Sequence, residues 1–390
     1  MAFVLSSQNV FDYLLEQRIC TQLELRLRQV ELKVAKNFNL LLGLPDGRQL
    51  LVKQERHNKR KTTGVLNEWR FHEFLKRLTE LSHMRLFLSE VLHLDKNESV
   101  IVLNYLNDYR DLAEFYNQEK LFPTAIATLI GTILATVHSA TIKRQEYRHF
   151  WRNQESVPTD QTFEPFWKPG RIGPEVFGNY PSDILKFFTL YQRYDSLGQA
   201  IAELTNAFSA CCLVHNDLKL NNILLYLDWE QALVEAKPSS QSTVRLIDWE
   251  RCAWGDPAFD LGTLIASYLQ LWLSSLVVSK TISIEESLRM AMTPLEQLQP
   301  SIAALVKAYL KQFPEILAYR PDFLHRVVQF AGLALIHQIQ ATIQYQKVFG
   351  NAGICTLQVA KSLLCRPAQS ISTVCGLSES ELTAHDCMPV

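Results

Sequence analysis

Short apolar runs separated by turn residues characterise the first hundred residues of the chain. One pair of runs, Leu40–Leu42 and Leu50–Lys53, flanks the turn Pro45–Gly47. A second pair, Glu90–Leu94 and Val100–Leu103, flanks a polar stretch. Apolar runs of this length on both sides of a turn predict two β-hairpins. We therefore expect a small antiparallel sheet in this part of the chain.

Helical periodicity of apolar residues dominates the remainder. Asn9 stands before apolar residues at helical spacing and is positioned to cap a helix, and residues 65–78 carry a second apolar face. Residues 123–140 and 322–350 predict longer helices, the latter with the broad apolar face of a buried bundle helix. The chain after residue 260 is predicted to be helical until residues 370–390, which are mostly polar and are expected to fray.

Composition and charge exclude several classes of protein. The 390 residues are 47% hydrophobic and carry a net charge of -1, so the chain can form two cored lobes and has no basic surplus for nucleic acid. Its eight cysteines show neither metal spacing nor a secreted disulfide framework, and residues 1–7 have no basic leader, which indicates a cytoplasmic protein. The uncharged stretch 261–279 is interpreted as a buried helix and not as a membrane span, because Gln270 and several serines dilute it.

A polar turn between two apolar strands carries the clearest chemistry. In residues 213–225, His215, Asp217 and Asn222 have the H-x-D-x-x-x-x-N spacing of a phosphoryl-transfer catalytic loop. In that chemistry the aspartate accepts the proton of an attacking hydroxyl, and the asparagine amide oxygen binds a metal that neutralises the phosphates. We predict these roles for Asp217 and Asn222.

A second acid follows the apolar strand 244–247. Asp248 at this strand end is a predicted ligand for a divalent ion that bridges the phosphates. Asp228 stands in a similar Leu-Asp-Trp-Glu context but lies only six residues after Asn222, too few for the strand to turn back, so it is excluded. The stretch 230–243 between the two copies is predicted to be an exposed hairpin connection.

These motifs, followed by Gly-Asp-Pro-Ala-Phe-Asp-Leu at 255–261, resemble the pattern of the aminoglycoside phosphotransferase and choline kinase group. These are small-molecule kinases built on the protein-kinase-like fold. The resemblance implies an α+β, two-lobed fold, with a small β-sheet N-lobe at 1–103 that binds the nucleotide and a larger, mostly helical C-lobe at 104–390. It also implies ATP and Mg²⁺ as cofactors.

The resemblance assigns further residues to the nucleotide. Lys53, at the end of an apolar strand, occupies the position of the lysine that binds the α- and β-phosphates. Glu68, in the following helix, is expected to hold that lysine and is preferred over Glu73 because it continues the buried face. Asn104 and Leu106 lie where this fold offers backbone groups to the adenine edge.

Other residues of the resemblance surround the catalytic loop. Lys219 is expected to offset charge on the γ-phosphate, and His215 to support the loop through hydrogen bonds. Asp260, at a helix start, is expected to accept backbone N–H bonds from the loop. His138 is interpreted as a packing histidine.

The sequence departs from protein kinases in two places and carries an aromatic-rich insertion. Residues 34–39 contain no G-x-G-x-x-G, so a glycine-rich phosphate cradle is absent, and the basic cluster 59–61 is interpreted as a solvated turn. Residues 141–195 form an aromatic-rich insertion of the kind that shapes the acceptor pocket in related kinases, although plain core packing fits equally well. Only seven residues separate Asp248 from Asp256, too few for an activation segment.

The predicted function is ATP-dependent transfer of the γ-phosphoryl group to a hydroxyl of a small molecule, with no nucleic acid partner and no membrane span. A noncatalytic nucleotide-binding protein of the same fold is the main alternative, and an atypical protein kinase is a weaker one. The motifs leave the identity of the acceptor open.

Overall fold

The computed structural model describes residues 3–24, 29–33, 38–55, 64–152, 182–235, 242–277 and 281–384. The chain forms two compact units, one of Met1–Leu112 with Asn221–Cys252 and one of Ala113–Leu220 with Ala253–Val390. The predicted lobe boundary after residue 103 remains a prediction. The predictions for 34–37, for the basic cluster 59–61 and for most of the 141–195 insertion lie outside the described residues.

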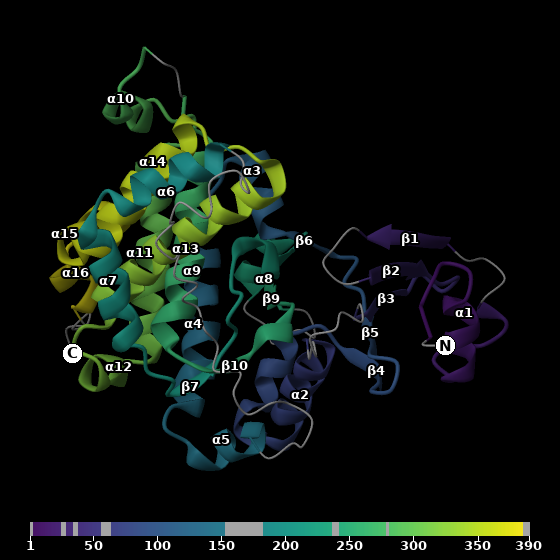
Figure 1. Ribbon diagram of the computed structural model, residues 1–390. Coiled ribbons are helices and arrows are strands. Elements are labelled where there is room, and N and C mark those ends of the chain that lie inside the picture. The colour runs from purple at the N-terminus through teal and green to yellow at the C-terminus, as the bar shows by residue number, and fades with distance from the viewer. Residues whose placement is uncertain are drawn as a thin grey trace. The chain divides into compact units, whose positions relative to one another are not determined.

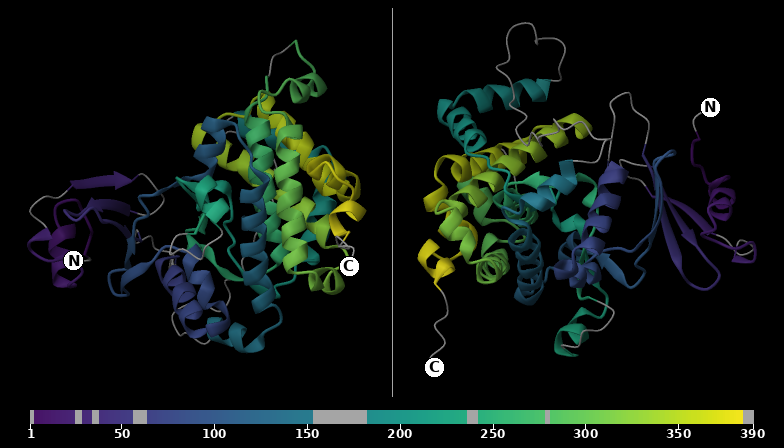
Figure 2. Two further views of the ribbon diagram at one scale, coloured as in Figure 1. Left: turned by 180° about the vertical axis from the view of Figure 1, so that it is seen from behind. Right: turned by 90° about the horizontal axis from the view of Figure 1, so that it is seen from below.

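The first unit contains a five-stranded antiparallel sheet (Figures 1 and 2). Its strand order is β1-β2-β3-β5-β4, and its strands are β1 (Gln29–Lys33), β2 (Phe38–Gly43), β3 (Gln49–Gln54), β4 (Val91–Asp95) and β5 (Val100–Asn104). Both predicted hairpins are therefore confirmed.

The alternation of side chains along these strands gives the sheet two different faces. Leu50 and Val52 of β3 pack in one cluster with α1 (Val10–Glu16), which lies against the sheet in Figure 2. Leu51 and Ile101 point to the other face, where they pack with Val65 of α2 (Gly64–Arg77). Since side chains alternate along a strand, Lys53 shares the face of Leu51 and is directed toward α2.

Helices α1 and α2 of this unit agree with the sequence in position, but one capping prediction is wrong. Helix α1 begins at Val10 and α2 covers the predicted 65–78 region. Asn9, however, makes no side-chain cap: its Oδ1 accepts the Ser6 N–H at 2.7 Å, and its Nδ2 donates to the Val4 carbonyl at 2.9 Å. The preceding turn therefore engages the side chain that the helix was expected to use. The 3₁₀ segment η2 (Thr79–Phe87) follows α2.

A second, three-stranded sheet of the first unit carries the predicted metal region. Its order is β6-β8-β9, with bounds β6 (Tyr109–Asp111), β8 (Ile223–Tyr226) and β9 (Val244–Leu246). The 3₁₀ segments η4 (Leu220–Asn222) and η5 (Trp249–Arg251) adjoin β8 and β9. The stretch 230–243 joins the antiparallel strands β8 and β9, so the predicted hairpin connection is confirmed. Its first part forms the helix α8 (Trp229–Glu235) from strong helix formers such as glutamate, glutamine, alanine and leucine.

The second unit is mainly helical and holds the larger core. Its helices are α3 (Leu112–Glu119), α4 (Thr124–Thr141), α5 (Gln145–Arg152), α6 (Ser182–Gln192), α7 (Asp195–Asn206), α9 (Pro257–Ser274), α10 (Ile284–Arg289), α11 (Leu295–Gln312), α12 (Glu315–Tyr319), α13 (Phe323–Gln346), α14 (Asn351–Cys365), α15 (Pro367–Cys375) and α16 (Glu379–Thr383). A short antiparallel pair joins β7 (Cys212–Val214) to β10 (Ala253–Gly255).

Close helix packing positions the elements that carry the predicted catalytic residues. Helix α4 packs on α11, and α9 packs on α13 (Figure 1). A Cβ at Gly131 of α4 would lie 2.4 Å from the Leu305 carbonyl oxygen, so this helix pair approaches as closely as it does only with glycine there. The predicted α+β class, with a small sheet and a larger helical part, is confirmed.

The structure tests the predictions for the apolar stretch 261–279 and the polar stretch 370–390. Residues 261–274 of the stretch 261–279 form most of α9, whose side chains are largely buried, so the interpretation of this part as a core helix is confirmed. Among the described residues, only Thr124–Thr141 is long and apolar enough to cross a membrane, and 56% of that helix is buried inside the fold. The predicted fraying of 370–390 is wrong as far as residue 383, because α15 and α16 bury Val374 and Leu382.

Candidate active site

A buried lysine in the first unit joins two carboxylates. The Nζ atom of Lys53, near the end of β3, lies 3.2 Å from Glu68 Oε2 and 3.0 Å from Asp248 Oδ1. Lys53 is 7% exposed and Glu68 only 3% exposed. The predicted pairing of Lys53 with Glu68 is therefore present, whereas Glu73 bonds to Lys76 at the surface.

Burial and charge act in opposite directions on this cluster. Burial lowers the pKa of the Lys53 ammonium, but the Glu68 and Asp248 carboxylates outweigh it and hold that pKa above its ordinary value. Burial also raises the pKa of Glu68, and the neighbouring Asp248 carboxylate adds to this effect against the opposing Lys53 charge. Lys53 therefore stays charged, and its two partners compete for one ammonium group.

Packing between α2 and η5 fixes both carboxylates. The rings of Phe71 and Trp249 stack with centroids 3.8 Å apart and planes 11° from parallel. Asn67 Nδ2 donates to the Glu250 carbonyl at 3.3 Å, and Trp249 Nε1 donates to the Leu246 carbonyl at 3.2 Å. Because α2 carries Glu68 and η5 follows Asp248, this contact holds the two acids in one local structure.

The strand register brings the two predicted metal ligands to the same end of the β8–β9 pair. Ile223 pairs with Leu246, and the Asn222 carbonyl accepts the Ile247 N–H at 2.9 Å. Asn222 is thus opposite the residue before Asp248. The backbone of Asp248 is left-handed, with φ 67° and ψ 50°, a conformation that costs energy for a residue with a Cβ and often marks functional positions.

The donor set at this strand end suits a small divalent cation. Asn222 and Asp248 offer an amide oxygen and a carboxylate, which are hard oxygen ligands. Among the described residues, no cluster of three or more His, Cys, Asp or Glu side chains forms a metal cage. Mg²⁺ normally takes one or two protein ligands and completes its shell with water and phosphate oxygens, so the residues present fit that ion. The excluded Asp228 lies in an exposed turn before α8.

In the second unit, Asp260 organises the loop that follows β7. Its carboxylate is fully buried and accepts the His215 N–H at 2.6 Å and the Asn216 N–H at 2.9 Å. The predicted backbone contacts of Asp260 are therefore present. Asn216 has a left-handed backbone with φ 62°, so these two bonds hold the turn that presents Asp217 in a strained conformation.

Two side chains complete this loop. Asp217 is partly exposed, and its Oδ2 accepts a bond from Lys219 Nζ at 3.1 Å. The backbone N–H of Asp217 lies 3.3 Å from Nδ1 of the fully buried His215, so His215 supports the loop by a hydrogen bond, as expected.

A second buried histidine, His138, also contacts the Asp260 carboxylate. His138 Nε2 lies 3.3 Å from Asp260 Oδ2, and its Nδ1 lies 2.9 Å from the Tyr309 hydroxyl. Burial holds the pKa of Tyr309 well above its ordinary value, so that hydroxyl keeps its proton and can donate to Nδ1. His138 then donates from Nε2 to Asp260, and its interpretation as a packing histidine holds with the addition of this bond.

The two predicted adenine contacts lie at the end of β5 in the first unit. The Asn104 N–H donates to the Glu90 carbonyl at 2.9 Å, and the Leu106 carbonyl accepts the Tyr109 N–H at 3.3 Å. The next amide, of Tyr105, donates to the Gln49 carbonyl at 2.8 Å. These bonds tie the segment after β5 to its neighbours.

Sequence reasoning missed one buried acid beside the loop. Asp256 is fully buried and accepts the Ala258 N–H at 3.1 Å as the cap of α9, while Arg326 Nη2 donates to it at 2.8 Å. Asp256 also accepts the Ser209 N–H at 3.2 Å. The Asp-Pro dipeptide at 256–257 signals the cap, since proline is favoured at the first helical position, but nothing in the sequence points to Arg326 as partner.

Several solved structures resemble the chain over almost its full length. A choline/ethanolamine kinase family protein from Mesorhizobium loti is 15% identical, with 94% of this chain and 99% of that chain covered at a TM-score of 0.47. Choline kinase LicA from Streptococcus pneumoniae is 16% identical, with 92% and 98% covered at 0.40. Amicoumacin kinase hAmiN, in complex with AMP-PNP, Ca²⁺ and Ami, is 12% identical, with 92% and 96% covered at 0.48. At these TM-scores the likenesses add no argument.

Sequence comparison matches part of the chain to one family. A search of curated proteins found no match. Residues 106–272, which contain the catalytic loop, Asp248 and Asp260, match the choline/ethanolamine kinase family. The predicted resemblance to the aminoglycoside phosphotransferase and choline kinase group is thereby confirmed, and over these residues the chain is similar to a family of kinases that act on small molecules.

Proposed function

We propose that the protein transfers the γ-phosphoryl group of ATP to a hydroxyl group of a small molecule. The observation that carries the proposal is the Lys53 ammonium held between Glu68 and Asp248, at 3.2 and 3.0 Å. A strand lysine paired with a helix glutamate, next to a metal-binding aspartate, is the arrangement that positions nucleotide phosphates in kinases. The family match over 106–272 supports the same chemistry.

In this proposal the first unit binds the nucleotide. Lys53 would contact the α- and β-phosphates, and Glu68 would keep its ammonium in place. Backbone groups of Asn104 and Leu106 would meet the adenine edge. Residues 1–103 would then form the nucleotide-binding lobe, and residues 104–390 would contain the acceptor pocket.

Asn222 and Asp248 would hold Mg²⁺, which, when bound, neutralises charge on the β- and γ-phosphates. Their register across β8 and β9 supports this assignment. Lys53 now donates to Asp248, so the bond between them would loosen when Asp248 turns to a cation. Glu68 would then become the main partner of Lys53.

Asp217 would accept the proton of the acceptor hydroxyl. It is partly exposed at the end of a loop whose backbone is held by Asp260 and His215, which would fix the direction of the carboxylate. Lys219, 3.1 Å from Asp217, would place a positive charge near the transferred group.

The acceptor class and location complete the proposal. We infer a small hydroxylated molecule as partner and no nucleic acid, since the net charge of -1 gives no basic surface surplus. We also infer a cytoplasmic protein, since the eight cysteines show no secreted disulfide framework. Choline, ethanolamine, aminoglycosides, amino-acid alcohols and sugars are the first candidates to examine.

A panel assay tests the proposal. Purified protein is incubated with Mg²⁺, ATP and each candidate acceptor, with a generic protein as a further substrate, and ADP release and phosphorylated product are measured. We expect ADP release that depends on one class of small acceptor. Phosphorylation of only the protein would support an atypical protein kinase, and ATP binding without transfer to any acceptor would support the noncatalytic alternative.

A further inference from the structure

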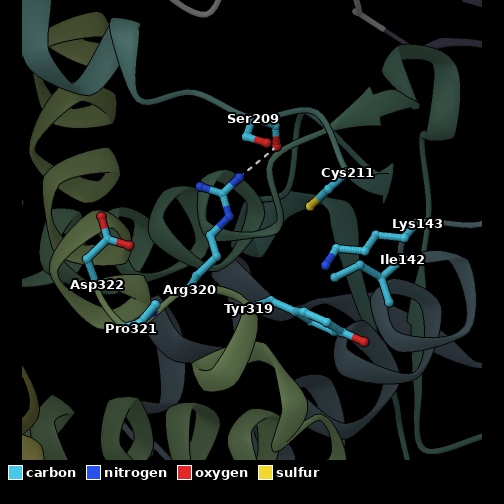
Figure 3. Close-up of a pocket in the computed structure, with 8 residues that line it drawn as sticks. All are labelled: Ile142, Lys143, Ser209, Cys211, Tyr319, Arg320, Pro321 and Asp322. Atoms are coloured by element: carbon cyan, nitrogen blue, oxygen red, sulfur yellow. Dashed lines mark hydrogen bonds between the residues drawn. The ribbon is translucent and has the colours of Figure 1, made fainter.

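A pocket of 340 Å³ opens in the second unit, where the end of α4, the segment before β7 and the turn between α12 and α13 meet (Figure 3). Its volume is in the range of small-ligand sites. Side chains that line it include Lys143, Ser209, Cys211, Tyr319 and Arg320. None of these residues has a role in the proposed phosphoryl transfer.

Two cations line this pocket. Lys143 Nζ lies 3.8 Å from the centroid of the Tyr319 ring, which is a cation–π contact. This contact involves no carboxylate and does not neutralise the ammonium charge. Arg320 Nη2 donates to the Ser209 carbonyl at 3.2 Å, the bond drawn in Figure 3. Arg320 Nη1 also lies 3.5 Å from Asp256 Oδ2.

The acids around the pocket do not cancel these charges. Asp256 is already bonded to Arg326 at 2.8 Å, and the exposed Asp322 lies 3.8 Å from Arg326 Nη1. Among the residues that line the pocket, two cations, Lys143 and Arg320, therefore face one carboxylate, that of Asp322. The pocket carries a positive surplus, which favours an anionic ligand.

A thiol points into this positive region. Figure 3 shows the Cys211 sulfur directed into the pocket, between the Arg320 guanidinium and the Lys143 side chain. A hydrogen bond from the Cys212 thiol has the largest effect on Cys211 and lowers its pKa. Burial and the Asp256 carboxylate oppose this effect, and the Arg320 charge adds to it. Burial raises the pKa values of Cys20 and Cys212. Partly exposed cysteines beside cations are the reactive ones, since the thiolate is the nucleophile.

We propose that this pocket is a modification site at which Cys211 forms mixed disulfides with anionic low-molecular-weight disulfides. The Cys211 thiolate attacks one sulfur of the reagent and forms a new S–S bond as the bond between the two reagent sulfurs breaks. Cys211 is oxidised to the disulfide level, and the departing half of the reagent is reduced to a thiolate that takes a proton from water. Lys143 and Arg320 attract the anionic groups of the reagent.

The position of Cys211 places such an adduct next to the strand that leads to the catalytic loop. Its N–H donates to the Gly255 carbonyl at 2.9 Å, and its carbonyl accepts the Lys143 N–H at 2.8 Å. Strand β7 begins at the next residue. The modification itself does not depend on the proposed phosphoryl transfer, so it can be tested without an activity assay.

The test compares two disulfides and two cysteines. The full chain is incubated with glutathione disulfide, which is anionic, or with bis(2-hydroxyethyl) disulfide, which is neutral. Peptide mass spectrometry then follows adduct formation at Cys211 and at Cys365, which is also partly exposed and serves as the internal control. The variants Lys143→Gln and Arg320→Gln are measured in the same way. The wild-type measurement is also repeated at high ionic strength, which screens the charges without a substitution.

We expect Cys211 to react about tenfold faster than Cys365 with the anionic reagent. The charge preference is the rate with the anionic reagent divided by the rate with the neutral one, and that of Cys211 is expressed relative to that of Cys365. It should fall about threefold in Lys143→Gln and in high salt, because one attractive charge is removed or screened. A Cys211 rate no greater than that of Cys365 would overturn the site. A charge preference unchanged by both Lys143→Gln and salt would overturn the assignment of an anionic ligand.

Discussion

Replacing Asp260 with alanine removes the acceptor of two buried backbone amides at once. The carboxylate lies 2.6 Å from the His215 nitrogen and 2.9 Å from the Asn216 nitrogen, and it is fully buried, so water cannot take its place without opening the core. Each buried donor left without a partner costs about 1–3 kcal/mol. The two amides together therefore predict a loss of about 2–6 kcal/mol.

This loss of stability can be measured by calorimetry and by hydrogen exchange. For a unit of this size the stability loss corresponds to a melting temperature lower by roughly 5–20 °C. The His215 and Asn216 amides should lose their protection against exchange with solvent. Asp260→Asn keeps one acceptor oxygen and should give an intermediate result.

Asp183→Ala is the matched control. Asp183 also accepts a backbone amide, that of Phe349 at 2.8 Å, but it pairs with an exposed lysine at the surface, where water can replace the lost acceptor. Its loss should lower stability much less than the loss of Asp260. The reasoning would be refuted if the His215 and Asn216 amides stay protected in Asp260→Ala and this variant melts at the same temperature as Asp183→Ala.

Three further predictions follow from particular contacts. Asp248→Ala should weaken Mg-ATP binding about tenfold or more in calorimetric titration, whereas Asp228→Ala, in the same sequence context, should leave it unchanged; equal affinities would remove the metal assignment. Burial lowers the pKa of His72 to about 4, so the unfolded chain binds the proton first as pH falls, and this histidine should reduce the free energy of unfolding by up to about 3 kcal/mol from pH 6.5 to 4. In His72→Gln the fall over the same pH range should be smaller by that amount. Gly131→Ala should destabilise the chain by about 1–3 kcal/mol in denaturant unfolding, since the new Cβ would strike a carbonyl of α11, while Gly198→Ala, with open space around it, should stabilise by about 0.5–1 kcal/mol; the same sign for both would contradict the packing.

Local patterns in the sequence predicted the elements that depend on local physics. The hairpin around the glycine turn at Gly47, which has φ 86°, formed where alternation and turn chemistry agree. The pairing of Lys53 with Glu68 was predicted through the family resemblance, and the helix period selected Glu68 over Glu73 because Glu68 continues the buried face of α2. The hydrogen bonds of Asp260 were predictable only through the family resemblance, which linked positions 45 residues apart.

Contacts between distant segments escaped prediction for a physical reason. The stack of Phe71 on Trp249 joins residues far apart in sequence, and either ring alone fits any core. Asp256 and Arg326 are 70 residues apart, and a buried ion pair leaves no periodic signal. Asn9 shows the limit even for local patterns, because a capping residue can bond to the turn before it as readily as to the helix after it.

The central claim is that Asp217 accepts the proton of the acceptor hydroxyl, and one measurement tests it most directly. Phosphoryl transfer from ATP and ATP affinity are compared in the wild type, in Asp217→Ala and in Asn221→Ala, an exposed control in the same loop. Loss of a general base predicts that Asp217→Ala transfers phosphate about 10²–10⁴-fold more slowly, with ATP affinity within about twofold of the wild type and with Asn221→Ala unaffected. Equal transfer rates in the wild type and in Asp217→Ala would contradict the account.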